Sequence, residues 1–308
     1  MVNSFNYIQS FIPIISSVFL LLISVNCGSD ASINVQNLSR QYDSSVESDV
    51  SYQIIMAVTD IAIGENRLAF AIIGKSGPVI AERVNIKLSP TGNESERFTT
   101  RTEAVFHDWP QGNAGVYIAD VNFDTSGEWT IQAEGSTTNK GVFGVTSFFV
   151  NKTSSSPAVG TKPKPLENLT FNEVTDISQI TSSLQPDMDL YKISVSDAMN
   201  NGMPTIITFA SPSFSRTSTC GPQIEIISSI NERFGHRLNI IHIEVYEQSE
   251  MDDEGKYELK VSGFLEEWGL NSEPFTFMLD KDGIIVAKFE GFVTLSELEA
   301  KITEILEI

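Results

Sequence analysis

A single cysteine in the body of the chain is the residue best suited to chemistry. Cys220 lies in the stretch FASPSFSRTSTCGPQI, residues 209–224, directly before Gly221 and Pro222. An apolar, β-branched run precedes this stretch and a run with helical spacing follows it, so we expect Cys220 where a buried strand gives way to a helix. The unpaired amides and the dipole at a helix start stabilise a thiolate, which is the nucleophilic form of cysteine.

The other cysteine, Cys27, follows an apolar run near the N-terminus. Residues 11–25 are apolar, and the run is shorter than a spanning helix needs, so it predicts the apolar region of an export signal. The CGSD that follows resembles the start of a bacterial lipoprotein, in which this cysteine carries the lipid, although Ser24 and Asn26 depart from the usual flanking residues. We expect an exported protein, anchored by lipid at Cys27 on the extracellular or periplasmic face of the membrane. The alternative is later cleavage, which would give a soluble secreted protein.

These two positions leave Cys220 without an intramolecular partner, because Cys27 is expected to carry lipid or to be removed. Exported proteins in oxidising compartments usually pair their cysteines. The fold must therefore be stabilised by its apolar cores.

Length and charge limit the function further. The chain has 308 residues, enough for about two domains. Its formal net charge of -20 repels phosphate backbones and anionic headgroups, so we expect no nucleic-acid partner and membrane contact only through the N-terminal lipid.

The pattern along the chain predicts two folded domains after the signal segment. Residues 1–27 are the predicted signal, and residues 28–50 are a polar, Ser-rich tether. Residues 51–150 alternate apolar and polar residues in short runs separated by turns, which predicts an all-β antiparallel sandwich. The run from Tyr117 to Trp129 resembles Ig-like domains of exported bacterial proteins. Residues 151–186 have linker composition.

Residues 187–308 change to an α/β pattern. The runs PTIITFA and LNIIHIEVY are nearly continuously apolar, as in strands covered on both faces, and a helical run lies between them. The hairpin FTFMLD–KDG–IIVAKFEG follows, and a capping box of Thr294 and Glu297 begins the last helix. The expected order is strand, helix, strand, helix, hairpin, helix.

This order, the Cys-Gly-Pro at a helix start and Pro274 directly before a strand resemble the thioredoxin superfamily, in its exported, membrane-tethered branch. The resemblance implies thiol–disulfide chemistry in which Cys220 is the nucleophile. It places Pro274 at the family's cis-proline, where it organises the substrate strand, and the Glu273 backbone beside the sulfur. The residues implied for the loop around the site are Ser215, Arg216, Thr217, Gly221, Pro222 and Gln223.

Two departures from the family pattern limit this chemistry. Gln223 stands where the usual second cysteine resolves the mixed disulfide, and Ser215 stands where the longer-loop relatives carry another cysteine. Without a second thiol, the mixed disulfide waits for an outside thiol. The expected function is therefore single-thiol exchange on exported protein thiols or disulfides, with an external thiol reductant. The alternative is a non-catalytic cell-surface binding or scaffold module with a degenerate thioredoxin fold.

A peroxiredoxin-like peroxidase is a weaker alternative. Thr217 stands three residues before Cys220, as in peroxiredoxins, but Pro212 stands eight residues before it instead of seven. No arginine follows Arg237 to polarise a peroxide.

No metal or other cofactor is expected. His236 and His242 have no second soft ligand near them in sequence, and His242 alternates within an apolar run, so it is expected to pack in a core. The acidic run at residues 247–258 lacks the spacing of a calcium loop.

Overall fold

The computed structural model describes residues 52–92, 99–109, 114–137, 140–215, 218–248 and 259–307. All of these residues belong to one compact unit, Asp49–Ile308. The predicted signal and tether, with Cys27, lie outside the described residues. No helix in the described part of the chain is long and apolar enough to cross a membrane.

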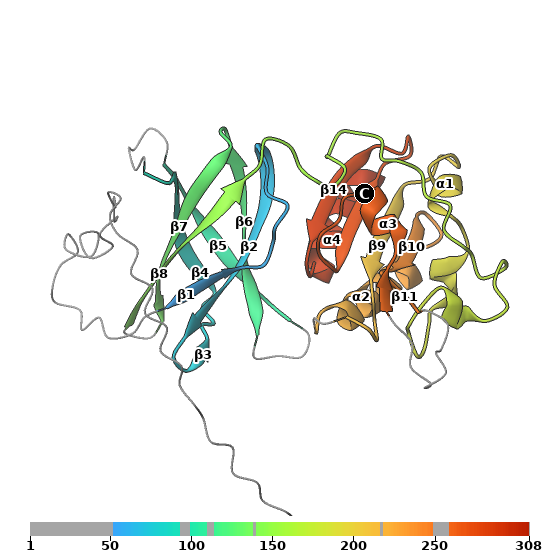
Figure 1. The fold of residues 1–308 in the computed structure, drawn as a ribbon, viewed down its shortest axis with the longest axis horizontal. Coiled ribbons are helices and arrows are strands. Elements are labelled where there is room, and N and C mark those ends of the chain that lie inside the picture. The colour runs from blue at the N-terminus through green and yellow to red at the C-terminus, as the bar shows by residue number, and fades with distance from the viewer. Residues whose placement is uncertain are drawn as a thin grey trace, which may run out of the picture. The chain divides into compact units, whose positions relative to one another are not determined.

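An antiparallel sheet of eight strands forms the first half of the described chain (Figure 1). Its strands are β1 (Gln53–Met56), β2 (Gly64–Gly74), β3 (Gly77–Pro78), β4 (Arg83–Pro90), β5 (Thr100–Asp108), β6 (Gly115–Phe123), β7 (Gly127–Thr137) and β8 (Lys140–Val150). They follow the order β1-β2-β6-β5-β4-β7-β8, with β3 paired to β2. The expected sandwich has two separate sheets, whereas the β4–β5 ladder joins all the strands into one hydrogen-bonded path. Tyr52 bridges to Gly144 in β8, so the two ends of the path meet.

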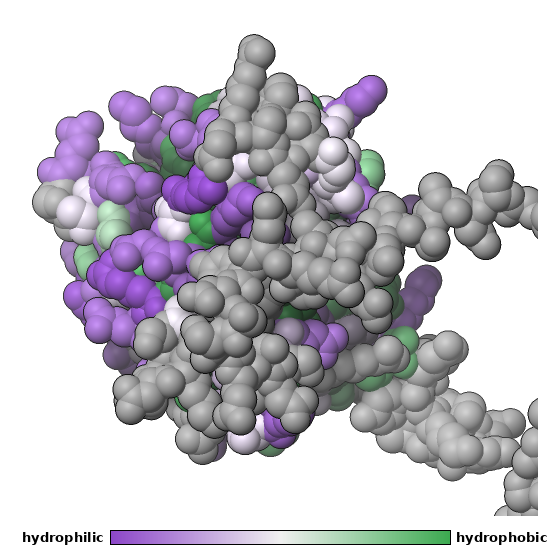
Figure 2. All heavy atoms as spheres, turned by 90° about the vertical axis from the view of Figure 1, so that its left-hand side faces the viewer, coloured by the Kyte–Doolittle hydropathy of each residue, from purple (hydrophilic) through white to green (hydrophobic). Residues whose placement is uncertain are grey.

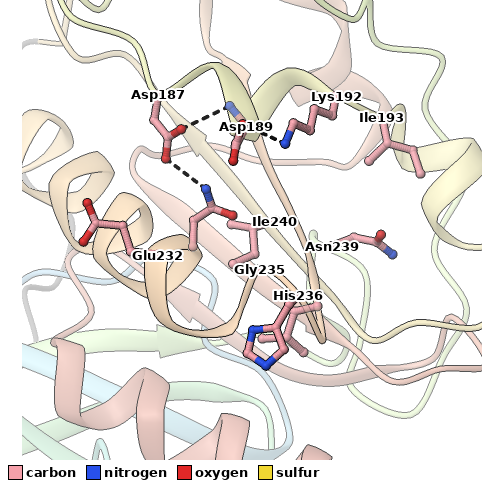
Figure 3. Close-up of a pocket in the computed structure, with 11 residues that line it drawn as sticks. Asp187, Asp189, Lys192, Ile193, Glu232, Gly235, His236, Asn239 and Ile240 are labelled. Atoms are coloured by element: carbon pink, nitrogen blue, oxygen red, sulfur yellow. Dashed lines mark hydrogen bonds and ion pairs between the residues drawn. The ribbon is translucent and has the colours of Figure 1, made fainter.

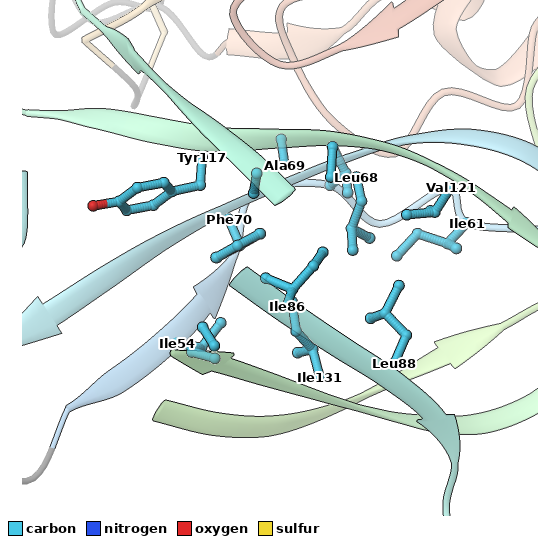
Figure 4. Close-up of a cluster of buried hydrophobic side chains, with 14 of the residues drawn as sticks. Ile54, Ile61, Leu68, Ala69, Phe70, Ile86, Leu88, Tyr117, Val121 and Ile131 are labelled. Carbon is cyan, nitrogen blue, oxygen red and sulfur yellow. The ribbon is translucent and has the colours of Figure 1, made fainter. Parts of the chain in front are cut away.

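The alternation of side chains selects the core of this sheet. In β6, Tyr117, Val121 and Phe123 are buried whereas Asn122 is exposed, as the period of two requires. Figure 4 shows apolar side chains from β1, β2, β4, β6 and β7 gathered into this core. The buried Tyr117 keeps a polar partner, because its hydroxyl donates to the carbonyl of Val79 at 3.0 Å. The surface is hydrophilic over much of the described part of the face in Figure 2.

The segment predicted as a linker packs against the rest of the unit. It carries the short helix η3 (Ile177–Gln179), and the short helices η4 (Met188–Tyr191) and α1 (Val195–Ala198) follow it. Leu166 and Ser156 are buried. The segment is therefore part of the folded unit, although its composition is that of a spacer.

A second, mixed sheet carries the candidate site. Its strands are β9 (Thr205–Ala210), β10 (Asn239–Glu244), β13 (Phe275–Leu279) and β14 (Ile285–Glu290), in the order β10-β9-β13-β14. The β10–β9 pair is parallel, while β13 is antiparallel to both β9 and β14. Every residue of β9 is buried, as its apolar run predicts. A small pair, β11 (Tyr246–Gln248) and β12 (Leu259–Val261), stands apart from this sheet.

Two helices of this half begin where the sequence predicts a helix start. α2 (Cys220–Phe234) buries Ile224, Ile227 and Ile230. α3 (Gly263–Glu267) is short, and α4 (Leu295–Leu306) begins with the predicted capping box of Thr294 and Glu297. The order β9, α2, β10, α3, β13–β14, α4 confirms the order of strands and helices predicted from the sequence pattern of residues 187–308.

Candidate functional site

The structure places Cys220 at the first residue of α2. β9 ends at Ala210, and the chain reaches α2 through a loop that begins with a turn in which the Ser215 amide donates to the Ser211 carbonyl. The N-cap is Thr219, whose side chain makes no cap hydrogen bond. The predicted position at a helix start is therefore confirmed.

The exposure of Cys220 is less favourable for chemistry. Its residue is 0% exposed, and it belongs to a buried cluster that includes Ala210, Ile224 and Phe289. A thiolate exchanges by attacking a disulfide sulfur directly. In the described conformation, the sulfur is closed to such a partner.

Gln223 fills the place of the family's second thiol. It lies three residues after Cys220, so the two side chains are neighbours on one side of α2. Gln223 is 0% exposed, and its Oε1 accepts from the backbone amide of Val293 at 2.9 Å. Its Nε2 is buried without a partner among the described residues. The amide therefore ties α2 to the chain just before α4.

The peptide bond between Glu273 and Pro274 is cis, as the resemblance implies. Phe275 pairs with Phe209, so Pro274 lies beside the end of β9, where the chain leaves for the Cys220 loop. The Glu273 side chain faces β11, because its Oε1 accepts from the Tyr246 hydroxyl at 3.4 Å.

The remaining predicted loop residues divide into two groups. Pro222 is buried in the first turn of α2, whereas Ser215 and Gly221 are partly exposed. Arg216 and Thr217 lie outside the described residues.

The sequence did not predict a set of hydrogen bonds that hold the Cys220 loop against a segment distant in sequence. The Ser182 hydroxyl accepts from the Ser213 amide at 3.1 Å, and the Ser213 hydroxyl donates to the Ser182 carbonyl at 2.6 Å. The Ser182 amide donates to Glu244 Oε2 at 2.7 Å. Thirty-one residues separate Ser182 from Ser213, and no local pattern marks a contact of this range.

Tyr191 and His242 form a buried hydrogen-bonded pair beside the end of β9. The Tyr191 hydroxyl is 2.7 Å from His242 Nδ1, and His242 Nε2 is 3.0 Å from the Ala210 carbonyl. Burial lowers the pKa of His242, against the opposing effects of the Glu244 charge and the Ala210 hydrogen bond. Burial likewise raises the pKa of Tyr191 well above its usual value. The prediction that His242 packs in a core is confirmed, since it is 2% exposed.

A polar pocket of about 520 Å³ lies at the other end of α2 (Figure 3). Several of its polar groups pair with one another: Asn231 Nδ2 donates to Asp187 at 3.1 Å, and Lys192 pairs with Asp189 at 2.7 Å. Gly235 lines the pocket and lies at the opposite end of α2 from Cys220. At a rise of about 1.5 Å per residue, the two ends are about 20 Å apart. The pocket is therefore separate from the thiol. The described residues hold no cluster of three or more metal-binding side chains.

Comparison with known proteins gives two partial likenesses. No family model matches the chain, and no curated protein matches it. One similar solved structure is named as the thiol:disulfide interchange protein DsbE of Chlorobium tepidum. It is 13% identical, with a TM-score of 0.34, over 49% of this chain and 99% of that one. Another is the pneumococcal exposed lipoprotein thioredoxin Etrx1 of Streptococcus pneumoniae, 22% identical, with a TM-score of 0.28, over 35% of this chain and 88% of that one. The chain thus has thioredoxin-like structural neighbours, at similarities too low to carry an assignment of activity.

Proposed function

We propose that residues 187–308 form a thioredoxin-like domain that acts as a non-catalytic binding module in an exported protein. The observation that carries this proposal is the closed state of the thiol: Cys220 is 0% exposed. Gln223, in the place of a second thiol, supports it by holding Val293 through a buried hydrogen bond.

The chemistry of exchange explains why these features matter. A thiolate attacks one sulfur of a disulfide, the other sulfur leaves as a thiolate, and a second thiol then releases the mixed disulfide. The chain has two cysteines, and the second one, Cys27, belongs to the predicted lipoprotein-like start. A domain with a buried attacking sulfur and no resolving thiol is suited to docking by its surface.

Single-thiol exchange is the second candidate, and the position of Cys220 favours it. Cys220 begins a 15-residue helix, where the dipole favours a thiolate, and the cis Pro274 lies at the end of the neighbouring strand. In this case Cys220 would attack a disulfide of an exported protein, and an outside thiol would release the product and be oxidised in its place. The sulfur would first have to become exposed.

The sheet of residues 51–150 is proposed to be an Ig-like sandwich that offers a second docking surface. Its strand order supports this, because β1-β2-β6-β5 and β4-β7-β8 correspond to the two sheets of the constant-type Ig fold, joined here through β4 and β5. Export with a lipid on Cys27 is proposed from the sequence. Labelling cells with a palmitate analogue tests it, since Cys27→Ser must abolish the label.

An insulin-reduction assay separates the two candidate functions. The full chain and its Cys220→Ser variant are compared with dithiothreitol as the outside thiol. Equal rates at the level of dithiothreitol alone support the binding module. A rate that is raised by the wild-type chain and lost in Cys220→Ser refutes it and supports exchange.

A further inference from the structure

The segment before β9 lies against the cluster that contains Cys220. Three of its side chains, Phe171, Ile177 and Ile180, are partly buried against this cluster. The Phe171 amide donates to the carbonyl of Tyr191 at 2.9 Å, which fixes the start of the segment to η4. We call residues 171–183 the strap.

Side-chain hydrogen bonds organise the middle of the strap. The Asp176 carboxylate caps η3 by accepting from the Ser178 amide at 2.9 Å, and Gln179 Oε1 accepts in return from the Asp176 amide at 3.3 Å. This capping box presents Ile177 and Ile180 on the side that packs on the core.

The end of the strap contacts the Cys220 loop at two residues, Ser211 and Ser213. Ser182 exchanges two hydrogen bonds with Ser213, at 3.1 and 2.6 Å, and its hydroxyl lies 3.5 Å from that of Ser211. Its amide is held by Glu244 at the end of β10. The strap therefore crosses from β10 to the loop that leads into α2.

The loop in turn lies against the start of α2. The Pro212 carbonyl oxygen is 3.8 Å from the position that a Cβ on Gly221 would occupy. Pro212 lies between Ser211 and Ser213, the two residues in contact with Ser182. The strap, the loop and the residue next to Cys220 thus form one chain of contacts.

We propose that the strap is a covering element that keeps Cys220 buried, and that its release exposes the thiol without unfolding the domain. The inference rests on the proposed function in one respect, namely that the thiol of Cys220 is buried in the folded protein. The strap is suited to local release because it has few buried groups: η3 contains no buried residue, Ile177 and Ile180 are only partly buried, and Thr181 is its one buried residue. Segments of this kind open at a lower free energy than the whole domain.

The alkylation rate of Cys220 tests the strap. The full chain, in a Cys27→Ser background so that one thiol remains, is treated with N-ethylmaleimide at pH 7. Ile180→Ser weakens the contact with the core, and Ser213→Ala removes a hydrogen bond to Ser182 without touching the core. Leu184→Ser is the matched control. It replaces a large aliphatic side chain by serine just outside the strap, at a position that is 92% exposed.

We expect Ile180→Ser and Ser213→Ala to raise the rate at least tenfold, while Leu184→Ser matches the wild type. Circular dichroism must show the folded signal in the same samples. If Ile180→Ser fails to fold, Ser213→Ala alone decides. Rates that stay at the wild-type value in the folded variants overturn the strap. That outcome leaves the binding module intact. Conversely, insulin reduction by the wild-type protein refutes the binding module but not the strap, which the alkylation rates alone decide.

Discussion

Lys288 Nζ lies 2.9 Å from Asp60 Oδ2, in an ion pair between β14 and the segment that follows β1. The two side chains are 20% and 5% exposed. The hydroxyls of Ser154 and Ser156 each donate to the same carboxylate oxygen at 2.5 Å, and the Ser155 amide donates to the other oxygen at 2.8 Å. Three segments distant in sequence therefore meet at one buried charge.

The first prediction is that Asp60→Asn lowers the free energy of unfolding by about 3 kcal/mol, because it leaves the Lys288 charge in a mostly buried place without its partner. Urea denaturation at pH 7 measures the change. Glu267→Gln is the control, since Glu267 pairs with Lys164 at an exposed position and its loss is expected to cost less than about 1 kcal/mol. Equal losses in the two variants would contradict a special role for Asp60.

The same carboxylate predicts a loss of stability in acid. Burial alone would raise the pKa of Asp60, but hydrogen bonds from Ser154, Ser156 and Lys288, together with the Lys288 charge, hold it far below its usual value. A lowered folded-state pKa gives stability that is complete above the unfolded value of about 3.9 and is lost as the pH falls below it. The stability difference between wild type and Asp60→Asn should therefore shrink from pH 5 to pH 2. A difference that is constant over this range would refute the assignment.

The buried His242 predicts a second pH dependence of folding stability, at higher pH than that of Asp60. With its proton on Nε2, the neutral ring donates to Ala210 and accepts from Tyr191, so both nitrogens are satisfied. Burial lowers its pKa below 6.5, although the nearby Glu244 charge opposes this; Asp187 also faces Tyr191. A lowered histidine pKa gives stability that is present above the unfolded value and is lost as the pH falls through about 6.5.

We therefore expect His242→Gln to be less stable than wild type at pH 7.5 but to lose less stability between pH 7.5 and pH 5. Urea denaturation at the two pH values measures this. The ring-proton resonance of His242 provides a direct check: titration at or above pH 6.5 would contradict the predicted direction.

Local patterns predicted the elements that depend on neighbouring residues. The capping box of Thr294 and Glu297 marked the start of α4, and the turn at Asp282–Gly283 marked the hairpin, in which Gly283 has a φ of 76°. Both signals lie within a few residues of the structure that they determine, and this is why they can be read from the sequence.

The closure of the site could not be read in this way. The contact between Ser182 and Ser213 joins two ordinary loop serines, and neither position has a pattern that distinguishes it from a solvated turn. The Gln223–Val293 hydrogen bond spans 70 residues. The sequence therefore predicts where Cys220 stands along the chain, whereas its exposure depends on long-range contacts.

Gly269 offers a test of the packing between α3 and the segment after β8. Its φ is +61°, and a Cβ there would lie 2.2 Å from the Ser155 carbonyl oxygen. Gly269→Ala should lower the free energy of unfolding by about 2–4 kcal/mol, through the left-handed backbone and the overlap with a main-chain atom. Gly263→Ala is the matched control, because nothing lies within 4 Å of its added Cβ. Similar thermal midpoints for the two variants would contradict the close approach.

Gln223→Cys tests whether the absent second thiol is the only barrier to redox chemistry. Residues three apart on a helix have Cβ atoms about 5–6 Å apart, and a disulfide needs them about 3.5–4.5 Å apart, so the first turn of α2 must tighten by about 1–2 Å to form the bond. In a Cys27→Ser background, we expect glutathione disulfide to convert Cys220 and the new thiol to a disulfide only slowly, because both positions are buried and must first become exposed. The disulfide is seen as protection of both thiols from alkylation after denaturation. Ile226→Cys is the control, because six residues along α2 place its thiol beyond reach of Cys220.

The same variant separates the effect of the missing thiol from the effect of burial. If the buried position of Cys220 limits exchange, Gln223→Cys alone will reduce insulin slowly, and the combination with Ile180→Ser will reduce it much faster. If the second thiol is the only requirement, Gln223→Cys alone will already reach the rate of the combined variant. Equal rates in the two proteins would therefore show that the strap does not limit insulin reduction.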